Sequence, residues 1–176
     1  YTGEVSPVFL KEIGVSYVII GHSERRHIFG EKDEFINKKV RSALEHGLSP
    51  ILCVGETLEE REKGVTYEVI KNQIYGGLSG LISENVAKLV IAYEPVWAIG
   101  TGKNATKEDA NDVISFIRKL LYEKFDKTVG DNTRILYGGS VKPSNIKDFM
   151  DMDEIDGALV GGASLNAEDF SRIANY

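Results

Sequence analysis

The segment Leu89–Lys103 has the sequence LVIAYEPVWAIGTGK. Its apolar start predicts a buried β-strand, which ends at Glu94. Pro95 forces the residue before it into an extended conformation, and this fixes the direction of the Glu94 side chain. Gly100 and Gly102 then allow the backbone to hinge. A carboxylate at the end of a buried strand, followed by a segment that can close over it, predicts proton abstraction in a water-excluded site.

Short apolar runs rich in β-branched residues predict five strands in all. None of them alternates cleanly between apolar and polar residues. Continuous apolar runs of this kind predict strands that are buried on both faces, and therefore parallel strands. The five runs are Val15–Ile20, Pro50–Val54, Leu89–Tyr93, Arg134–Tyr137 and Gly157–Val160.

Helical patterns separate these strands. Apolar residues at helical spacing predict one helix over Asp33–His46 and another over Lys107–Phe125. Thr57, Thr106 and Asn166 each stand before an acidic residue three positions on, a pattern typical of helix N-caps. Further predictions are a leading helix, a short helix with Pro143 in its first turn, and a glycine-containing loop: Pro7–Ile13, Ser144–Met150, and Gly76 with Gly77 and Gly80.

The chain is therefore predicted to be a single α/β domain over residues 1–176, with five successive βα units. Two architectures have this alternation, an open doubly wound sheet and part of a (β/α)8 barrel. A complete barrel takes about 250 residues, so five units would form an incomplete one. The periodicity alone does not choose between the two.

Composition excludes several classes of protein. The chain has 176 residues, 42% of them hydrophobic, and a net charge of -6, which argues against nucleic acid or an anionic membrane as a partner. We expect no membrane span and no signal peptide, because no run of about 18 apolar residues occurs. The one cysteine, Cys53, lies in an apolar run and is expected to pack in the core, as in a cytoplasmic protein.

Two predicted strands end in residues that could be catalytic or structural. His22 follows the first strand at a helix start, where amide dipoles disfavour the imidazolium and keep the ring neutral and able to donate a proton. The alternative is a simple capping turn in which Ser23 caps the helix. Glu56, after the second strand, is expected to be structural, either near a cap or paired with Arg25 or Arg26.

A Gly-Gly pair follows each of the last two strands, in the sequences YGGS (137–140) and LVGGAS (159–164). Glycines at these places let backbone N–H groups approach a phosphate, and the pairing of two such turns favours a phosphate site over two tight turns. Gly100–Ala105 matches a dinucleotide fingerprint, but five residues separate it from the strand. The sequence has no P-loop and no Cys/His cluster, so we expect no metal site.

Together these segments resemble the triosephosphate isomerase family over the whole chain, in order and with the family's spacing. The resemblance implies a TIM (β/α)8 barrel, of which this chain would hold about five parallel βα units, without the first three. The segments that carry it are YTGEVSP (1–7), IGHSERR (20–26), CVGE (53–56), AYEPVWAIGTG (92–102), ILYGGSV (135–141) and GALVGGASL (157–165).

The resemblance implies a cofactor-free isomerase of glycolysis and gluconeogenesis that interconverts dihydroxyacetone phosphate and D-glyceraldehyde 3-phosphate. Glu94 would be the base that moves the proton between two carbons, and His22 the neutral electrophile that polarises the carbonyl. Both roles belong to the established mechanism of the family, and the resemblance alone carries them to these two positions. Glu24 would be a supporting acid beside them.

Further roles follow from the same resemblance. Gly100, Ser140, Gly161 and Gly162 would contact the substrate phosphate. Thr2, Gly3 and Glu4 would form the tip of a loop that enters a partner subunit, which implies a homodimer. The resemblance also implies a lid made of Pro95, Val96, Trp97, Ala98, Ile99, Gly100, Thr101, Gly102 and Lys103.

One departure from the family lowers the expected activity. The family has an Asn and a Lys at the end of its first strand, and no residue of this sequence corresponds to either. We therefore expect little or no turnover from this chain alone. The alternatives are a non-catalytic, self-associating fragment that at most binds phosphate, and a flavodoxin-like nucleotide binder, which would need a reversal in strand order.

Overall fold

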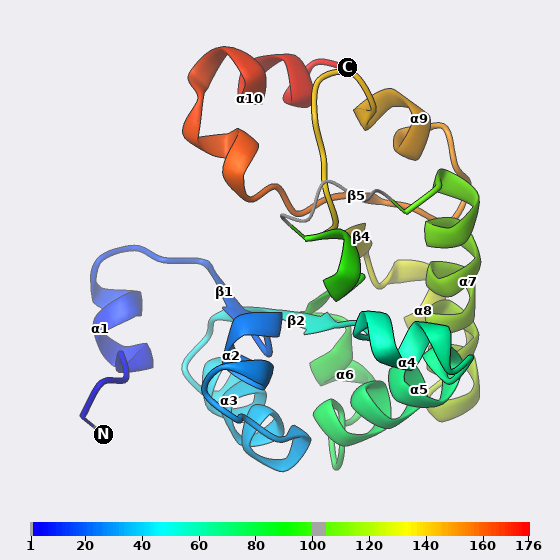
Figure 1. The fold of residues 1–176 in the computed structure, drawn as a ribbon. Coiled ribbons are helices and arrows are strands. Elements are labelled where there is room, and N and C mark those ends of the chain that lie inside the picture. Colours follow the sequence, from blue (N-terminus) through cyan, green and yellow to red (C-terminus); the bar gives the residue numbers. More distant parts are fainter. Residues whose placement is uncertain (1, 100–104) are drawn as a thin grey trace.

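The computed structural model describes residues 2–99 and 105–176. Its strands form one parallel sheet in the order β1-β2-β3-β4-β5. Figure 1 labels β1 and β2 in one half of the molecule and β4 and β5 in the other. This order follows the sequence without reversal, so it excludes the doubly wound and flavodoxin-like arrangements and agrees with a barrel. The strands are β1 (Tyr17–Ile20), β2 (Ser49–Val54), β3 (Val90–Tyr93), β4 (Ile135–Tyr137) and β5 (Gly157–Ala158).

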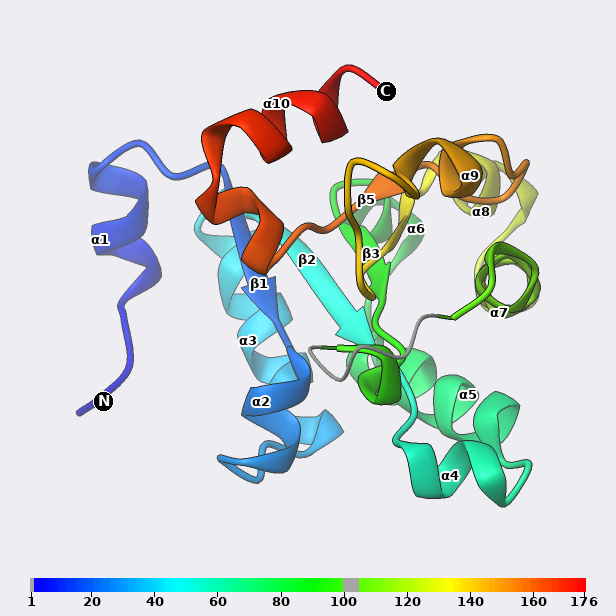
Figure 2. The same ribbon diagram turned by 45° about the horizontal axis from the view of Figure 1, so that its top comes forward.

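The long helices cover one face of the sheet. Helix α3 (Asp33–Glu45) contacts β1 and β2, α5 (Thr66–Gly77) contacts β2, and α7 (Lys107–Lys124) contacts β3 and β4. Figure 2 shows the sheet from a second direction, with α3 beside β2. The shorter helices are α1 (Pro7–Glu12), α2 (Ser23–His27), α4 (Leu58–Glu62), α6 (Ser83–Val86), α8 (Lys127–Asn132), α9 (Ile146–Met150) and α10 (Ala167–Ala174), with 3-10 turns η1 (Val96–Ala98) and η2 (Gly162–Leu165).

The core lies between this helical layer and the sheet. Leu52, Ile91 and Ile135 are fully buried, and the α3 residues Ile36 and Val40 are buried as their spacing predicts. Close-packed apolar side chains of this kind stabilise the arrangement because they remove apolar surface from water. The sheet is therefore anchored from one side, and its strand ends are held in register.

The sheet is open, and this corrects the expectation that all five strands are buried on both faces. Within residues 2–99 and 105–176, no strand pairs with the outer edge of β1 or of β5. At the β1 edge, Tyr17 and Ile19 are 51% and 49% exposed. Strand β5 is shorter than predicted, since only Gly157 and Ala158 pair with β4.

The predicted caps at Thr57, Thr106 and Asn166 are confirmed: each side-chain oxygen accepts a hydrogen bond from the backbone N–H three residues on. At α2 the N-cap is His22, not Ser23. The helix predicted over Ser144–Met150 begins only at Ile146, because the Lys142 N–H donates to Asn145 Oδ1 in a turn that precedes it.

The predicted loop at Gly76 and Gly77 is wrong, because both residues lie in the last turn of α5. A Cβ on Gly76 would come within 2.7 Å of Asp33 Cβ, and one on Gly77 within 3.0 Å of Leu52 Cδ2. These glycines therefore serve close packing of α5 against α3 and β2. Of the helices described, none is both long and apolar enough to span a membrane.

Candidate active site

Glu94 directly follows β3 and is held there by its backbone. Its N–H donates to the Val54 carbonyl oxygen at 2.7 Å. Gly55 passes so close that a Cβ on it would lie 1.7 Å from the Glu94 carbonyl oxygen. The Glu94 side chain also passes close to Gly138, with 2.8 Å between its Cγ and a Cβ built there. Two neighbouring strand ends thus fix Glu94, which is 3% exposed.

His22 faces Glu94 from the end of β1. Its Nε2 lies 3.6 Å from Glu94 Oε1, and its Nδ1 accepts a hydrogen bond from the Glu24 N–H at 3.3 Å. A nitrogen that accepts a hydrogen bond carries a lone pair, so the proton of a neutral ring lies on Nε2. The Ser23 N–H donates to Glu94 Oε2 at 3.3 Å. The structure therefore brings a carboxylate and an imidazole ring together at the carboxyl ends of the strands.

Burial raises the pKa of Glu94 above its ordinary value, because a charged carboxylate loses hydration in this place. His22, the Cys53 thiol, the Ser23 N–H and Arg26 oppose the shift but do not cancel it. Burial, with the negative charge of Glu94, also raises the pKa of the Cys53 thiol well above its ordinary value. A buried carboxyl with a raised pKa is a stronger base than a solvated one.

Cys53 is buried, as the sequence predicts for a core residue. The structure also places its thiol beside Glu94, a contact that the sequence did not predict. Cys53 lies opposite Ala92 in the sheet, and Glu94 follows Ala92 by two residues, so all three share one face. Predicting this contact requires the register of β2 on β3, which the sequence alone does not give.

Glu56 is fully buried and holds the start of the predicted lid. Its carboxylate accepts hydrogen bonds from Trp97 Nε1 at 2.9 Å and from the Tyr93 hydroxyl, and its carbonyl oxygen accepts the Val96 N–H. Its ionic partner is Arg61, at 3.4 Å, which corrects the expected pairing with Arg25 or Arg26. Of the lid residues, Pro95, Val96, Trp97, Ala98 and Ile99 are described, whereas Gly100, Thr101, Gly102 and Lys103 lie outside the described residues.

The residues predicted to bind phosphate lie after β4 and β5. Ser140 is half-buried, and its carbonyl oxygen accepts a hydrogen bond from Asn145 Nδ2. Gly161 and Gly162 are exposed, and a Cβ on either would meet no atom of residues 2–99 and 105–176 within 4 Å. Packing against this part of the chain therefore does not require the two glycines. Because all strands run in parallel, the two turns emerge at the same edge of the sheet as Glu94.

Glu24, the predicted supporting acid, is exposed and reaches the site through its backbone N–H. Thr2, Gly3 and Glu4 are exposed as well, and the Glu4 carboxylate forms ion pairs with Arg25 at 2.6 Å and Lys39 at 2.8 Å of the same chain. These distances tie the N-terminal loop to α2 and α3.

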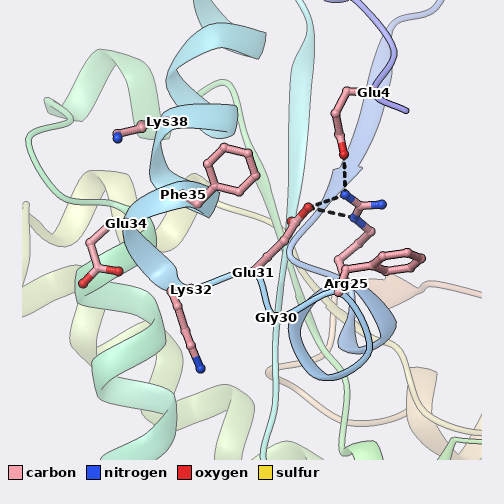
Figure 3. A pocket seen from close by; sticks show the side chains of 9 residues that line it. Glu4, Arg25, Gly30, Glu31, Lys32, Glu34, Phe35 and Lys38 are labelled. Atoms are coloured by element: carbon pink, nitrogen blue, oxygen red, sulfur yellow. Dashed lines mark hydrogen bonds and ion pairs between the residues drawn. The ribbon is translucent and has the colours of Figure 1, made fainter. Parts of the chain in front are cut away.

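A cavity of about 480 Å³ lies beside this N-terminal loop, away from Glu94, and Figure 3 shows its lining residues. The Glu31 side chain reaches it, is 4% exposed, and pairs through Oε1 with Arg25 and Lys39. Its second oxygen, Oε2, is buried without a hydrogen-bond partner among the described residues. Phe29, which lines the same cavity, is 64% exposed. No group of three or more described His, Cys, Asp or Glu residues could hold a metal ion.

Comparisons with known proteins agree with this geometry. A family profile described as "Triosephosphate isomerase" matches residues 1–176. The chain is 62% identical over 176 residues to the "Triosephosphate isomerase" of Caldanaerobacter subterraneus subsp. tengcongensis, covering 100% of this chain and 71% of that protein. It is 60% identical, over its full length, to proteins of the same name from Thermoanaerobacter sp. (strain X514) and Clostridium tetani, of which it covers 71% and 69%.

Proposed function

The chain belongs to the triosephosphate isomerase family, and we propose that its site is built for the interconversion of dihydroxyacetone phosphate and D-glyceraldehyde 3-phosphate, without a cofactor and with little turnover by this chain alone. We place the reaction in glycolysis and gluconeogenesis, in the cytoplasm. The observation that carries the proposal is the buried Glu94 carboxylate 3.6 Å from Nε2 of His22, a ring whose Nδ1 accepts the Glu24 N–H. The family match disfavours the alternative of a non-catalytic fragment.

In the proposed mechanism, Glu94 removes a proton from the carbon next to the ketone of dihydroxyacetone phosphate. The electron pair of that C–H bond moves into an enediolate, whose oxygen receives a hydrogen bond from His22 Nε2–H. Glu94 then returns its proton to the neighbouring carbon, and the hydroxyl proton moves between the two oxygens to leave the aldehyde. A neutral imidazole suits the donor role, because an N–H in a water-excluded site stabilises developing negative charge without giving up its proton early.

The first test is Glu94→Asp, which withdraws the carboxylate by about one methylene. Since base positioning matters mainly in the transition state, we expect kcat to fall by about 10²-fold with KM nearly unchanged. Steady-state kinetics in both directions of the reaction measure kcat and KM separately. Equal losses in kcat and in substrate affinity would argue against Glu94 as the base.

We propose that the phosphate of the substrate binds to backbone N–H groups of Gly161 and Gly162, with Ser140 and Gly100 as further contacts. The open space around the two glycines supports this, because it leaves their amides accessible. Gly161→Ala adds a methyl group that meets no atom of the described residues within 4 Å. We expect unchanged thermal stability and at least about 10-fold weaker binding of 2-phosphoglycolate, measured by calorimetry, because a displaced anion loses charge-assisted hydrogen bonds. Unchanged affinity would remove Gly161 from the site.

We also propose that residues 95–103 act as a lid whose first turn is fixed by Glu56. The indole N–H of Trp97 and the backbone N–H of Val96 both donate to Glu56, so the lid would pivot beyond this point. Closure over Glu94 would exclude water and strengthen the hydrogen bond from His22. Glu24 is proposed as a supporting acid, acting beside His22.

We propose a homodimer in which Thr2, Gly3 and Glu4 enter a partner subunit. The exposed Phe29 and the unpartnered Glu31 Oε2 beside this loop, both among the described residues, support an interface that supplies apolar contact and a donor. Sedimentation velocity should give a dimer for the unmodified chain and a monomer for Phe29→Asp. An unmodified chain that stays monomeric at high concentration would contradict the proposal.

A further inference from the structure

The guanidinium of Arg26 lies between the ends of β1 and β2 and is 8% exposed. Its Nε donates to the Gly21 carbonyl oxygen at 2.8 Å, and its Nη2 donates to the Cys53 carbonyl oxygen at 3.0 Å. Its Nη1 pairs with Asp33 Oδ1 at 2.6 Å. One planar group therefore joins two neighbouring strand ends to the first residue of α3. A guanidinium fixes the relative positions of its acceptors better than a lysine ammonium can, because its N–H donors are rigidly placed relative to one another.

Two of these contacts lie next to groups of the candidate active site. Gly21 immediately precedes His22, and Cys53 immediately precedes Val54, whose carbonyl oxygen accepts the Glu94 N–H. Gly21 has a φ of +76°, and a Cβ on it would lie 3.1 Å from Arg26 Nη2. The glycine thus provides both the turn before His22 and the space for the guanidinium.

The third partner of Arg26 is Asp33, which packs closely against α5. It is the first residue of α3, and Gly76 of α5 packs so closely that a Cβ there would meet Asp33 Cβ at 2.7 Å. The Asp33 side chain thus lies where α3 and α5 pack against each other. Through its ion pair with Asp33 and its hydrogen bonds to the Gly21 and Cys53 carbonyl oxygens, Arg26 therefore connects α3, where α5 packs, to the two strand ends.

We infer that Arg26 is a positioning residue, which holds the His22 ring at its working distance from Glu94 through the Gly21 and Cys53 carbonyl groups. The inference rests on the proposed function in so far as this pair performs proton transfer. Arg26 does not touch the substrate position that Glu94 and His22 define. Its positive charge has a second effect, since it lowers the pKa of Glu94 against the larger effect of burial.

Two variants separate position from charge. Arg26→Lys keeps the charge but cannot reach two carbonyl groups and a carboxylate together, whereas Arg26→Gln removes the charge as well. We expect kcat to fall by about 10- to 100-fold in both, with KM nearly unchanged, since misplacement of about 1 Å costs up to about 10²-fold in rate. The acid limb of the kcat/KM–pH profile should stay in place for Arg26→Lys and move to higher pH for Arg26→Gln.

Arg118→Lys is the matched control. Arg118 is also a mostly buried guanidinium that joins carbonyl groups and carboxylates, but its partners Thr133, Glu154 and Asp156 precede β4 and β5, at the opposite sheet edge. This variant should lose thermal stability while keeping kcat. If Arg26→Lys keeps the kcat of the unmodified chain, or if it and Arg118→Lys lose kcat by the same factor, the inference is wrong.

A spectroscopic readout makes the test independent of turnover. In ¹⁵N-histidine spectra of the unmodified chain, we expect His22 as a neutral ring protonated at Nε2, and in Arg26→Lys a mixture of the two neutral tautomers. A His22 spectrum unchanged by Arg26→Lys would overturn the inference. Turnover of the unmodified chain that Glu94→Gln leaves unchanged, with a His22 spectrum that responds to Arg26→Lys, would contradict the proposed function and leave the positioning role supported.

Discussion

At the residue scale, the candidate site depends on the Glu94 carboxylate, which is buried where its negative charge loses hydration. Burial raises the pKa of Glu94, and the protein offsets only part of that cost with His22, Cys53, Ser23 and Arg26. A protonated carboxyl would tolerate this place better than an ionised one. Sites of this kind commonly sacrifice stability for reactivity, which leads to a measurable pH dependence.

Glu94→Gln should stabilise the chain at pH 8 and lower its activity. A carboxyl whose folded-state pKa is raised contributes stability at pH values below its unfolded-state pKa, and this contribution is lost as the pH rises through the folded-state pKa. The stabilisation by Glu94→Gln should therefore be present at pH 8 and fall towards zero near pH 4. Urea unfolding of both proteins at the two pH values measures the difference.

The exposed Glu12, changed to Gln in the same way, serves as the control for a loss of charge alone. It should shift the free energy of unfolding by no more than about 0.5 kcal/mol at either pH. A Glu94→Gln effect that is equal at pH 4 and pH 8 would mean that burial does not destabilise the ionised carboxylate.

The sequence predicts the position of a single residue where the neighbouring residues determine the backbone conformation. It does not predict the ion-pair partner of a long side chain that several charged residues could reach. Pro95 and the preceding apolar run locate Glu94 at a strand end, and the structure places it there. By contrast, the sequence leaves Glu56 either near a cap or paired with Arg25 or Arg26. The structure places it next to the N-cap Thr57 and pairs it with Arg61. That choice depends on α4 bringing Arg61 back over Trp97, which no spacing in the sequence encodes.

At the element scale, α5 differs most from its prediction. Glycine normally weakens a helix, so the sequence predicts a loop at Gly76 and Gly77. The helix continues through them because α3 and β2 pack too closely for any larger residue. Tertiary contacts that form only in the assembled sheet here override local helix propensity. The helix caps depend on near neighbours in the sequence and are predicted correctly, at Thr57, Thr106 and Asn166.

Gly76→Ala should therefore destabilise the chain, although alanine favours helices by about 1 kcal/mol over glycine. The added methyl group must displace Asp33, and overpacking of this kind costs about 1–3 kcal/mol. We expect a lower free energy of unfolding and, because Asp33 supports Arg26, a lower kcat. Asn72→Ala, at an exposed position of α5, gains propensity without a clash and should be neutral or stabilising. A stabilising Gly76→Ala would show that α5 can shift away from α3.

At the scale of the whole molecule, the alternation of strands and helices predicts an α/β fold but leaves open which one. The strand order β1 to β5 decides it, and strand order depends on how units stack rather than on any unit's own sequence. The same holds for the exposed face of β1: Tyr17 and Ile19 belong to an apolar run, yet both remain about half exposed among the described residues. The candidate site thus lies at the strand ends of a sheet that is open among the described residues.

The central claim is that this chain carries the base and electrophile of the family on an open sheet, and turnover tests it most directly. The measurement is isomerase activity of material with an intact mass of 19.5 kDa, assayed beside Glu94→Gln and the full-length Caldanaerobacter relative. We predict turnover at least about 10²-fold below the relative, as expected when one oriented group is lost from such a site, and a further drop in Glu94→Gln. Turnover equal to that of the relative, or residual turnover that Glu94→Gln leaves unchanged, would contradict the claim.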